Sequence, residues 1–380
     1  TVEFGSNTSA LKGALTMTVG ANGSATFSGQ IKGTGSVTKA GAGTQTLTGS
    51  NTYSGGTTIS GGTLQLTGSG SISHTSGVAL ADGVGAKLVV SGVTASGSIS
   101  IGQLSGGAPS TGVGSGSVDL GSRKLVVTVP TGATSIFAGQ ISGTEGSLEK
   151  AGSGTLELSG SNGYTGNTVI RGGALKMSGG GSIAASAGVE LDAGVGAQFD
   201  LGGTDQTIKA LSGGGPIEQN GNQDFGFGSV IFRTASGGTA KTLTLSGQDG
   251  NWSYAGAFVG NGNVMKTGGS RLSLEHASPD YSGTTTITGG VLAVTQADSL
   301  PGASKLVIQG GSAESNGGSL EIAENMTLNP LSSFQMKGVG PSGEGALRLA
   351  SGKTGGYAGP ITLTGSTTVS AASGSVLTLA

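Results

Sequence analysis

Few side chains in this sequence have the chemistry that catalysis or metal binding requires. The chain contains no Cys and two His, His74 and His276, which stand near different parts of the sequence pattern. Serine catalysis needs a serine beside a base, and no Gly-x-Ser-x-Gly motif occurs. The 20 Asp and Glu residues are spread along the chain without a calcium-loop motif. We therefore expect no catalytic residue, no bound metal and no cofactor, and we place both histidines at turns or on the surface.

Two glycine-rich stretches match phosphate-binding loops only in part. The letters GVGPSG at 338–343 fit Gly-x-Gly-x-x-Gly once, but they contain Pro341 and precede a strand-like segment. The letters SGKTGG at 351–356 lack the first glycine of a P-loop, because that position is Leu347. With 18 Lys and Arg against 20 Asp and Glu, and no basic cluster, the charge also disfavours nucleic acid as a partner.

Internal repetition is the dominant feature of the sequence. Three tyrosines each stand eight residues before a glycine pair: Tyr53 before Gly61 and Gly62, Tyr164 before Gly172 and Gly173, and Tyr281 before Gly289 and Gly290. A lysine opens each copy, at Lys39, Lys150 and Lys266. An aromatic-x-Gly marker at Phe27, Phe137, Tyr254 and Tyr357 starts longer repeats. We therefore predict one fragment over 1–380, with long repeats at approximately 27–136, 137–253 and 254–356 and a truncated fourth at 357–380. The landmark tyrosines and glycines are interpreted as folding landmarks at corners.

The elements between these landmarks are predicted to be short strands. Segments such as GTLQLTG, GALKMSG and TLTLSG alternate apolar and polar residues and are bounded by Gly, Ser or Asn. Glycine accounts for 80 of the 380 residues, which suits a turn at every corner. A β-sandwich does not explain a long repeat with fixed landmarks, whereas stacked coils do. The predicted fold class is all-β: a right-handed parallel β-helix, a solenoid of roughly 15–18 coils.

Three passages of the chain resemble the passenger-associated repeats of bacterial autotransporters, the type V secreted surface proteins of Gram-negative bacteria. Two of the passages, TKAGAGTQTLTGSNTYSGGTTISGGTLQL and EKAGSGTLELSGSNGYTGNTVIRGGALKM, share the pattern Lys-x-Gly, Leu-x-Gly, Asn-x-Tyr-x-Gly and Gly-Gly-x-Leu. The other passage is LGGTDQTIKALSGGGPI at 201–217. The copy that contains Lys266 and Tyr281 departs from the pattern at EHASPDYSG, with one extra residue. The resemblance implies a surface-displayed β-helix, with a C-terminal β-barrel outside this sequence and repeats that support passenger folding and secretion. Both ends of the sequence are expected to be cuts in a longer protein.

One segment is expected to carry partner contacts. Residues 217–258 hold a five-residue insertion, Phe225, Phe227 and Trp252, the single Trp of the chain. Exposed aromatic side chains in a Gly-rich loop suit a sugar or protein contact, although the same rings could instead fill the coil interior.

The resemblance favours a non-enzymatic adhesin or stalk for host or cell–cell attachment, on the bacterial cell surface. Its expected partner is a host surface protein or glycan, or another copy of the chain, with no nucleic acid and no membrane insertion by this fragment. A self-associating passenger that drives aggregation, a spacer without ligand and a carbohydrate-active β-helix enzyme remain as alternatives.

Overall fold

The computed structural model describes residues 10–94, 98–108, 115–193, 196–215, 217–219, 222–224, 228–233, 238–310 and 317–380. In this part of the chain the elements are short strands without an α-helix, together with one 3-10 turn, η1, at Pro341–Gly343. None of the described segments approaches the length and apolarity that a membrane-crossing helix requires. The chain divides into two compact units, residues 1–187 and 188–380.

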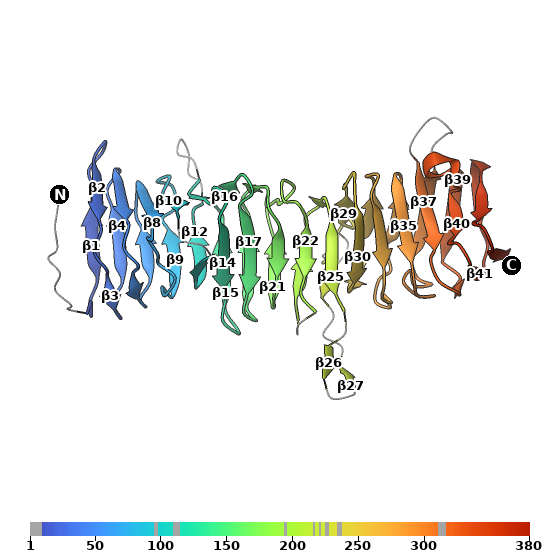
Figure 1. Cartoon of the computed structure of the whole chain (residues 1–380), viewed down its shortest axis with the longest axis horizontal. Helices are drawn as coiled ribbons and strands as arrows, with labels where there is room; N and C mark the ends of the chain where they lie inside the picture. Colours follow the sequence, from blue (N-terminus) through green and yellow to red (C-terminus); the bar gives the residue numbers. More distant parts are fainter. Residues whose placement is uncertain are drawn as a thin grey trace. The chain divides into compact units, whose positions relative to one another are not determined.

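The first unit stacks its strands in parallel ladders, so each coil pairs with the coils before and after it (Figure 1). The longest ladder contains β1 (Leu15–Thr18), β4 (Val37–Ala40), β7 (Thr57–Ile59), β9 (Gly77–Leu80), β12 (Gln103–Gly106), β15 (Thr134–Phe137), β18 (Thr155–Leu158) and β21 (Ala174–Met177). The second contains β2 (Ser24–Phe27), β5 (Thr44–Leu47), β8 (Thr63–Gly68), β10 (Lys87–Val93), β13 (Ser117–Asp119), β16 (Gln140–Gly143) and β19 (Gly163–Tyr164). The remaining strands are β11 (Ile99–Ile101), β14 (Lys124–Thr128), β17 (Ser147–Ala151) and β20 (Thr168–Ile170), and the pair β3 (Lys32–Gly33) and β6 (Thr52–Tyr53).

The second unit repeats this arrangement. Its longest ladder contains β22 (Val189–Leu191), β25 (Leu211–Gly214), β30 (Asn251–Ala255), β33 (Arg271–Leu274), β35 (Gly290–Val294), β37 (Gly318–Ile322), β40 (Leu347–Leu349) and β43 (Val369–Ala371). The next contains β24 (Gln206–Ile208), β29 (Thr242–Leu245), β32 (Asn263–Lys266), β34 (Thr284–Ile287), β36 (Lys305–Gly310), β39 (Ser333–Gly338) and β42 (Thr362–Thr367). Two shorter ladders contain β23 (Gln198–Asp200), β28 (Ser229–Ile231) and β31 (Ala257–Val259), and β38 (Thr327–Leu328), β41 (Thr354–Tyr357) and β44 (Val376–Leu379).

A hairpin interrupts the parallel pattern of the second unit. β26 (Ile217–Gln219) and β27 (Asn222–Asp224) pair antiparallel, unlike the other strand pairs of the described residues. The hairpin follows β25 in the chain, and Figure 1 shows it standing away from the coils below β25. The insertion that the sequence indicated therefore leaves the coil at a corner.

The core follows from strand alternation and parallel register. In the first unit one register column runs through β8, β10, β13 and β16, and its residues are all 0% exposed: Leu64, Leu88, Val118 and Ile141. Since successive side chains of a strand point to opposite faces, the residues on either side of each column member point to the opposite face of the ladder. Each coil thus buries one apolar row against the rows of its neighbours.

The fold class predicted from the sequence is confirmed, because the strands build a parallel β-solenoid of about 15 turns. The division into one fragment with long repeats starting at 27, 137, 254 and 357 stays a prediction.

Candidate functional site

The three landmark tyrosines lie inside the solenoid. Tyr53, Tyr164 and Tyr281 are at most 1% exposed. Each hydroxyl shares a hydrogen bond with the threonine four residues later, and the oxygen–oxygen distances are 2.6 Å to Thr57, 2.7 Å to Thr168 and 3.2 Å to Thr285. In the first two copies the threonine passes the network on to the next coil, at Thr75 and Ser186. The phenol hydroxyls are therefore satisfied in the interior, although their role as folding landmarks stays a prediction.

A buried asparagine closes the corner just before each of the first two tyrosines. Asn51 Oδ1 accepts a hydrogen bond from the Ile31 amide at 2.8 Å, and its Nδ2 donates to Gly49 O and Ser71 O, both at 3.0 Å. Asn162 makes the equivalent three bonds. In the third copy Ser278 Oγ accepts from the Phe258 amide at 3.1 Å. The divergent third passage thus retains the bond to the preceding coil with a different side chain.

The second glycine of each landmark pair is required by backbone geometry. Gly62, Gly173 and Gly290 have φ of 61°, 59° and 63°, the left-handed region that favours glycine. A Cβ at Gly173 would also lie 2.2 Å from Gly154 O, on the preceding coil. The glycine pair therefore permits both the turn and the close stacking of coils.

The lysine that opens each copy is buried and points at these turns. Lys39 and Lys150 are 0% exposed and Lys266 is 1% exposed. Lys150 Nζ donates to Ala151 O at 2.9 Å and Gly152 O at 2.7 Å, and to Gly172 O at 3.0 Å on the following coil. Lys39 makes the same three bonds to Ala40, Gly41 and Gly61. Lys266 donates to Gly268 O and to Gly289 O.

Burial shifts the ionisation of these groups. It lowers the pKa of Lys150 and Lys266 from 10.5 to about 8 and lowers the pKa of Lys39 in the same direction. It raises the pKa of Tyr53 and Tyr281 from 10.0 to about 12, even though the threonine hydrogen bonds act in the opposite direction. Both shifts arise because a charged form is disfavoured where water is excluded.

These shifts predict a maximum of stability in mildly alkaline solution. Between pH 8 and about 10 the unfolded chain keeps protons on lysines that the folded chain has lost, so the free energy of unfolding rises with pH. Above pH 10 the unfolded tyrosines ionise before the folded ones, so the free energy of unfolding falls. Urea unfolding followed by circular dichroism from pH 7 to 12 measures this profile. A free energy of unfolding that falls from pH 8 to 9.5 would contradict the prediction, and Lys150→Met should flatten the rise.

Trp252, one of the three predicted partner contacts, is partly exposed. Its side chain is 37% exposed, although its register neighbour on β33, Leu272, is buried. The preceding strand, β25, pairs with β30 only at Tyr254 and Ala255, which leaves residues 251–253 exposed. Phe225 and Phe227, the other two predicted contacts, lie outside the described residues. A contact surface made by all three aromatic residues stays a prediction.

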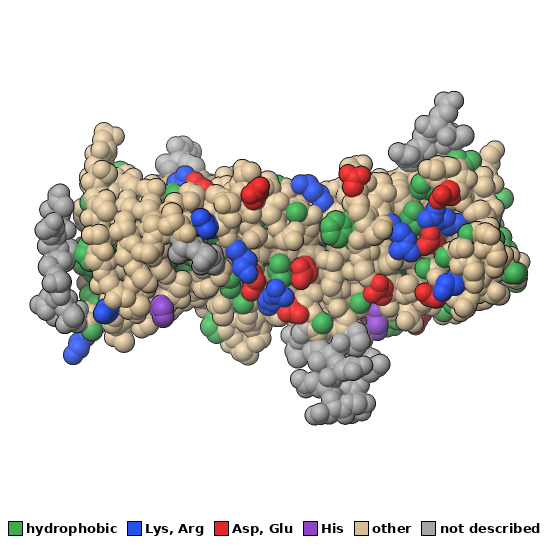
Figure 2. Space-filling model, viewed as in Figure 1, with side chains coloured by type: hydrophobic (Ala, Val, Ile, Leu, Met, Phe, Trp, Pro, Cys, Tyr) green, Lys and Arg blue, Asp and Glu red, His purple; other side chains and the backbone are tan. Residues whose placement is uncertain are grey.

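Two carboxylates line a groove of about 470 Å³ in the second unit. Glu321 accepts bonds from Arg271 at 2.6 Å and from Arg348 at 2.7 Å, and Arg348 also pairs with Glu344. Figure 2 shows cationic and anionic side chains close together in this region. Burial alone would raise the pKa of Glu321, but the hydrogen bonds and charges of the two arginines hold it below its ordinary value. A glycoside hydrolase requires a general acid with a raised pKa, and the lowered pKa of Glu321 does not fit that role.

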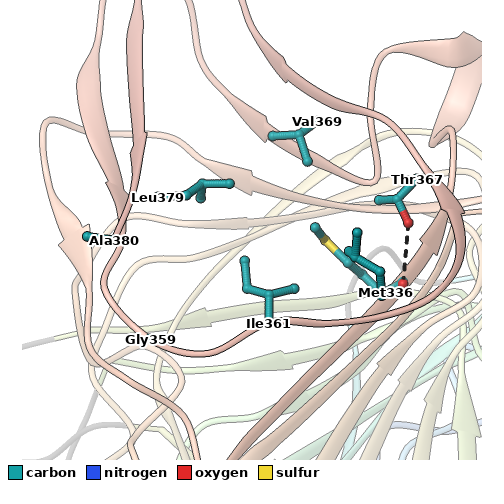
Figure 3. A pocket seen from close by; sticks show the side chains of 8 residues that line it. Met336, Gly359, Ile361, Thr367, Val369, Leu379 and Ala380 are labelled. Atoms are coloured by element: carbon teal, nitrogen blue, oxygen red, sulfur yellow. Dashed lines mark hydrogen bonds between the residues drawn. The ribbon is translucent and has the colours of Figure 1, made fainter.

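A second pocket, of about 360 Å³, is apolar. Figure 3 shows the side chains of Met336, Ile361, Val369 and Leu379 directed into one space, with Thr367 Oγ1 bonded to Met336 O at 3.4 Å. The remaining lining residues are Gly359, Leu363 and Ala380. None of these residues is an acid, a base or an activated nucleophile. Across the described residues, no group of three or more His, Asp or Glu side chains could hold a metal ion.

The sequence-based prediction missed two kinds of buried polar side chain in the repeats: the lysines, and the asparagines before the first two landmark tyrosines. The sequence pattern indicates Lys39 as a repeat marker and gives it no role inside the coil. Alternation could have placed it there, because Lys39 stands two residues after buried Val37 and so shares its face. The same spacing relates Lys150 to Leu148.

Comparisons with known proteins agree with this repeat structure. The passenger-associated-transport-repeat family matches three segments, residues 37–66, 148–177 and 265–294. Over 204 residues, 53% of the chain is 33% identical to the adhesin BmaC autotransporter of Brucella suis biovar 1 (strain 1330). The match spans 5% of the length of that relative. No solved structure matches the chain.

Each matched segment begins in the strand that carries the buried lysine, and it ends in the strand that follows or includes the second glycine of the pair. The repeats that the sequence pattern indicated are therefore confirmed: this chain carries three passenger-associated transport repeats and is similar to an autotransporter adhesin.

Proposed function

We propose that this chain is a non-enzymatic, adhesive part of an autotransporter passenger, displayed on the surface of a Gram-negative bacterium. Its partner is a host surface protein or glycan, and its repeats support folding and secretion of the passenger. Two observations carry the proposal: an antiparallel hairpin leaves the coils after β25, and the indole of Trp252 is exposed on β30, the strand that pairs with β25. Rigid parallel coils that present a projecting loop are a common arrangement for recognition. The printed name of the relative, an adhesin, supports the same function.

The binding role predicts a large effect of Trp252→Ala. Interface energy concentrates in a few aromatic residues, so loss of this ring should weaken attachment about tenfold. The measurement is binding of the purified chain to cultured epithelial cells over a range of concentrations. Because Trp252 is 37% exposed and its ring is otherwise covered, the substitution should also lower the urea midpoint, so binding is compared under conditions in which circular dichroism shows both chains folded.

Ile136→Ala is the matched control, because Ile136 is a large apolar residue that is 51% exposed. It should bind as the unaltered chain does. Equal binding by Trp252→Ala would exclude this indole as a contact. Failure of the unaltered chain to bind any host cell or matrix protein would count against the adhesive function itself.

Self-association is a second candidate, favoured by polar register columns on the outer faces. Thr16, Thr38 and Thr58 stand side by side on β1, β4 and β7, where their hydroxyls could meet those of another copy. Sedimentation from low to high micromolar concentration tests this role. Growth into dimers or larger species would support it, and a monomer throughout would leave host attachment as the function. The enzyme alternative draws little support from the groove at Glu321, because its carboxylates are neutralised by arginines.

A further inference from the structure

Three buried lysines occupy an unusual environment. The buried carboxylates Asp200 and Glu321 pair with arginines, as buried charges generally must. Lys39, Lys150 and Lys266 instead direct their ammonium groups at backbone carbonyl oxygens. Excluding an ammonium group from water is unfavourable, so a lysine that repeats at this position needs a compensating role.

The geometry of the acceptors indicates that role. For each lysine, at least one acceptor belongs to the turn that ends its own strand, and another is the first glycine of the landmark pair on the following coil. The separation between lysine and distant acceptor is 22 residues in two copies and 23 in the third. One side chain therefore joins two successive glycine turns.

The lysine is retained where its surroundings differ. The turn after Lys150 reads AGSG, whereas the turn after Lys266 reads TGGS, and the third copy also carries an extra residue before its tyrosine. Backbone carbonyls do not depend on side-chain identity, so the same donor can join both kinds of turn. The lysine and the glycine pair are consequently the residues on which this connection between two turns depends.

We propose that Lys39, Lys150 and Lys266 are the residues through which the three transport repeats act, each locking the glycine-pair turn of the following coil onto its own. This inference rests on the proposed role of the repeats in folding and secretion. The lock closes only when both coils are present. A coil without its successor leaves the ammonium short of an acceptor, which disfavours partly stacked states and makes neighbouring coils form together.

Hydrogen exchange on the whole 380-residue chain tests the lock directly. Lys150→Met keeps the length of the side chain and removes its donors. The expected result at neutral pH is at least tenfold faster exchange in peptides that cover 152–156 and 172–176, including the Ala174 amide that donates to Gly154 O at 3.2 Å. Lys32→Met, at an exposed position of β3, is the control and should leave these peptides unchanged. Equal protection of both turns in Lys150→Met and the control overturns the proposal.

If Lys150→Met gives no folded protein while Lys32→Met does, the same measurement is made on Lys39→Met in the first repeat, at 41–45 and 61–65. There the Thr63 amide, which donates to Gly43 O at 3.1 Å, reports the joint. Loss of protection in this variant supports the lock, and unchanged protection overturns it.

The amount of protein displayed on the cell surface tests whether the three lysines account for the proposed role of the repeats, separately from the adhesive function. The full-length protein with Lys39→Met, Lys150→Met and Lys266→Met together should reach the cell surface at a severalfold lower level than the protein with Lys32→Met. Normal display together with loosened turns would overturn the assignment of repeat function to these lysines. That result would leave the adhesive role unaffected, because Trp252→Ala tests it separately.

Discussion

Gly160→Ala is expected to destabilise the chain by about 3 kcal/mol or more. Gly160 is the glycine of the Leu-x-Gly motif in the second repeat, two residues after the end of β18. A Cβ at this position would lie 1.9 Å from Gly139 O and 2.7 Å from Gly139 C on the preceding coil. Neither atom can move without separating the stacked strands, so the clash has to be relieved by backbone displacement. Urea unfolding followed by circular dichroism measures the loss.

Gly163→Ala is the matched control, three residues away at the start of β19. A Cβ at Gly163 would meet no heavy atom within 4 Å, and the position is exposed. Alanine also restricts the unfolded chain, so this variant should be neutral or more stable by a few tenths of a kcal/mol. Similar losses for the two variants would show that steric fit between coils does not govern the position of glycine in this repeat.

Tyr164→Ala is expected to cost about 3–5 kcal/mol, the range for removal of a buried aromatic ring. Tyr164 is 1% exposed, so its ring leaves a cavity that the stacked coils on either side cannot readily close. Its hydroxyl is also one end of the network that runs through Thr168 to Ser186 on the next coil. The free energy of unfolding in urea is again the measured quantity.

Tyr164→Phe divides this loss between the ring and the hydroxyl. The ring remains and Thr168 retains its bond to Ser186, so the expected loss is about 1 kcal/mol. If Tyr164→Phe lost as much as Tyr164→Ala, the polar network and not the ring would be the landmark. If neither variant lost stability, the interpretation of the tyrosine as a folding landmark would be wrong.

The fold could be predicted from the sequence because its rules are local. Alternation in LQLTG and LKMSG sets which side chains face inward, and glycine pairs at a fixed distance from each tyrosine set the corners. The left-handed φ of Gly62 and Gly173 is the physical reason that these glycines recur. Stacking of successive coils then follows without long-range information.

The interior polar groups were harder to predict because they contradict average behaviour. A lysine at a strand end usually faces water, and only the alternation with Val37 or Leu148 would have placed Lys39 and Lys150 inside. The acceptors are backbone carbonyls, which leave no trace in the sequence. The replacement of Asn162 by Ser278 depends on the extra residue in the third copy, so simple alignment of the letters does not reveal it.

The sites on the outer surface depend on how complete each ladder is. Trp252 pairs in register with buried Leu272 on β33. Its indole is nevertheless exposed, because β25 pairs only with the C-terminal end of β30, at Tyr254 and Ala255. Glu321 meets Arg271 from 50 residues away, across the intervening strand β35. Neither arrangement has a signal in the local sequence, because both result from the coil register.

The hairpin of β26 and β27 leaves the ladders around it in place. Gly213 pairs with Tyr254 before the insertion, and Ser229 pairs with Ala257 after it, both in parallel register. A foreign peptide inserted at this corner is therefore expected to project from the coils and to leave the strand register and the buried core unchanged.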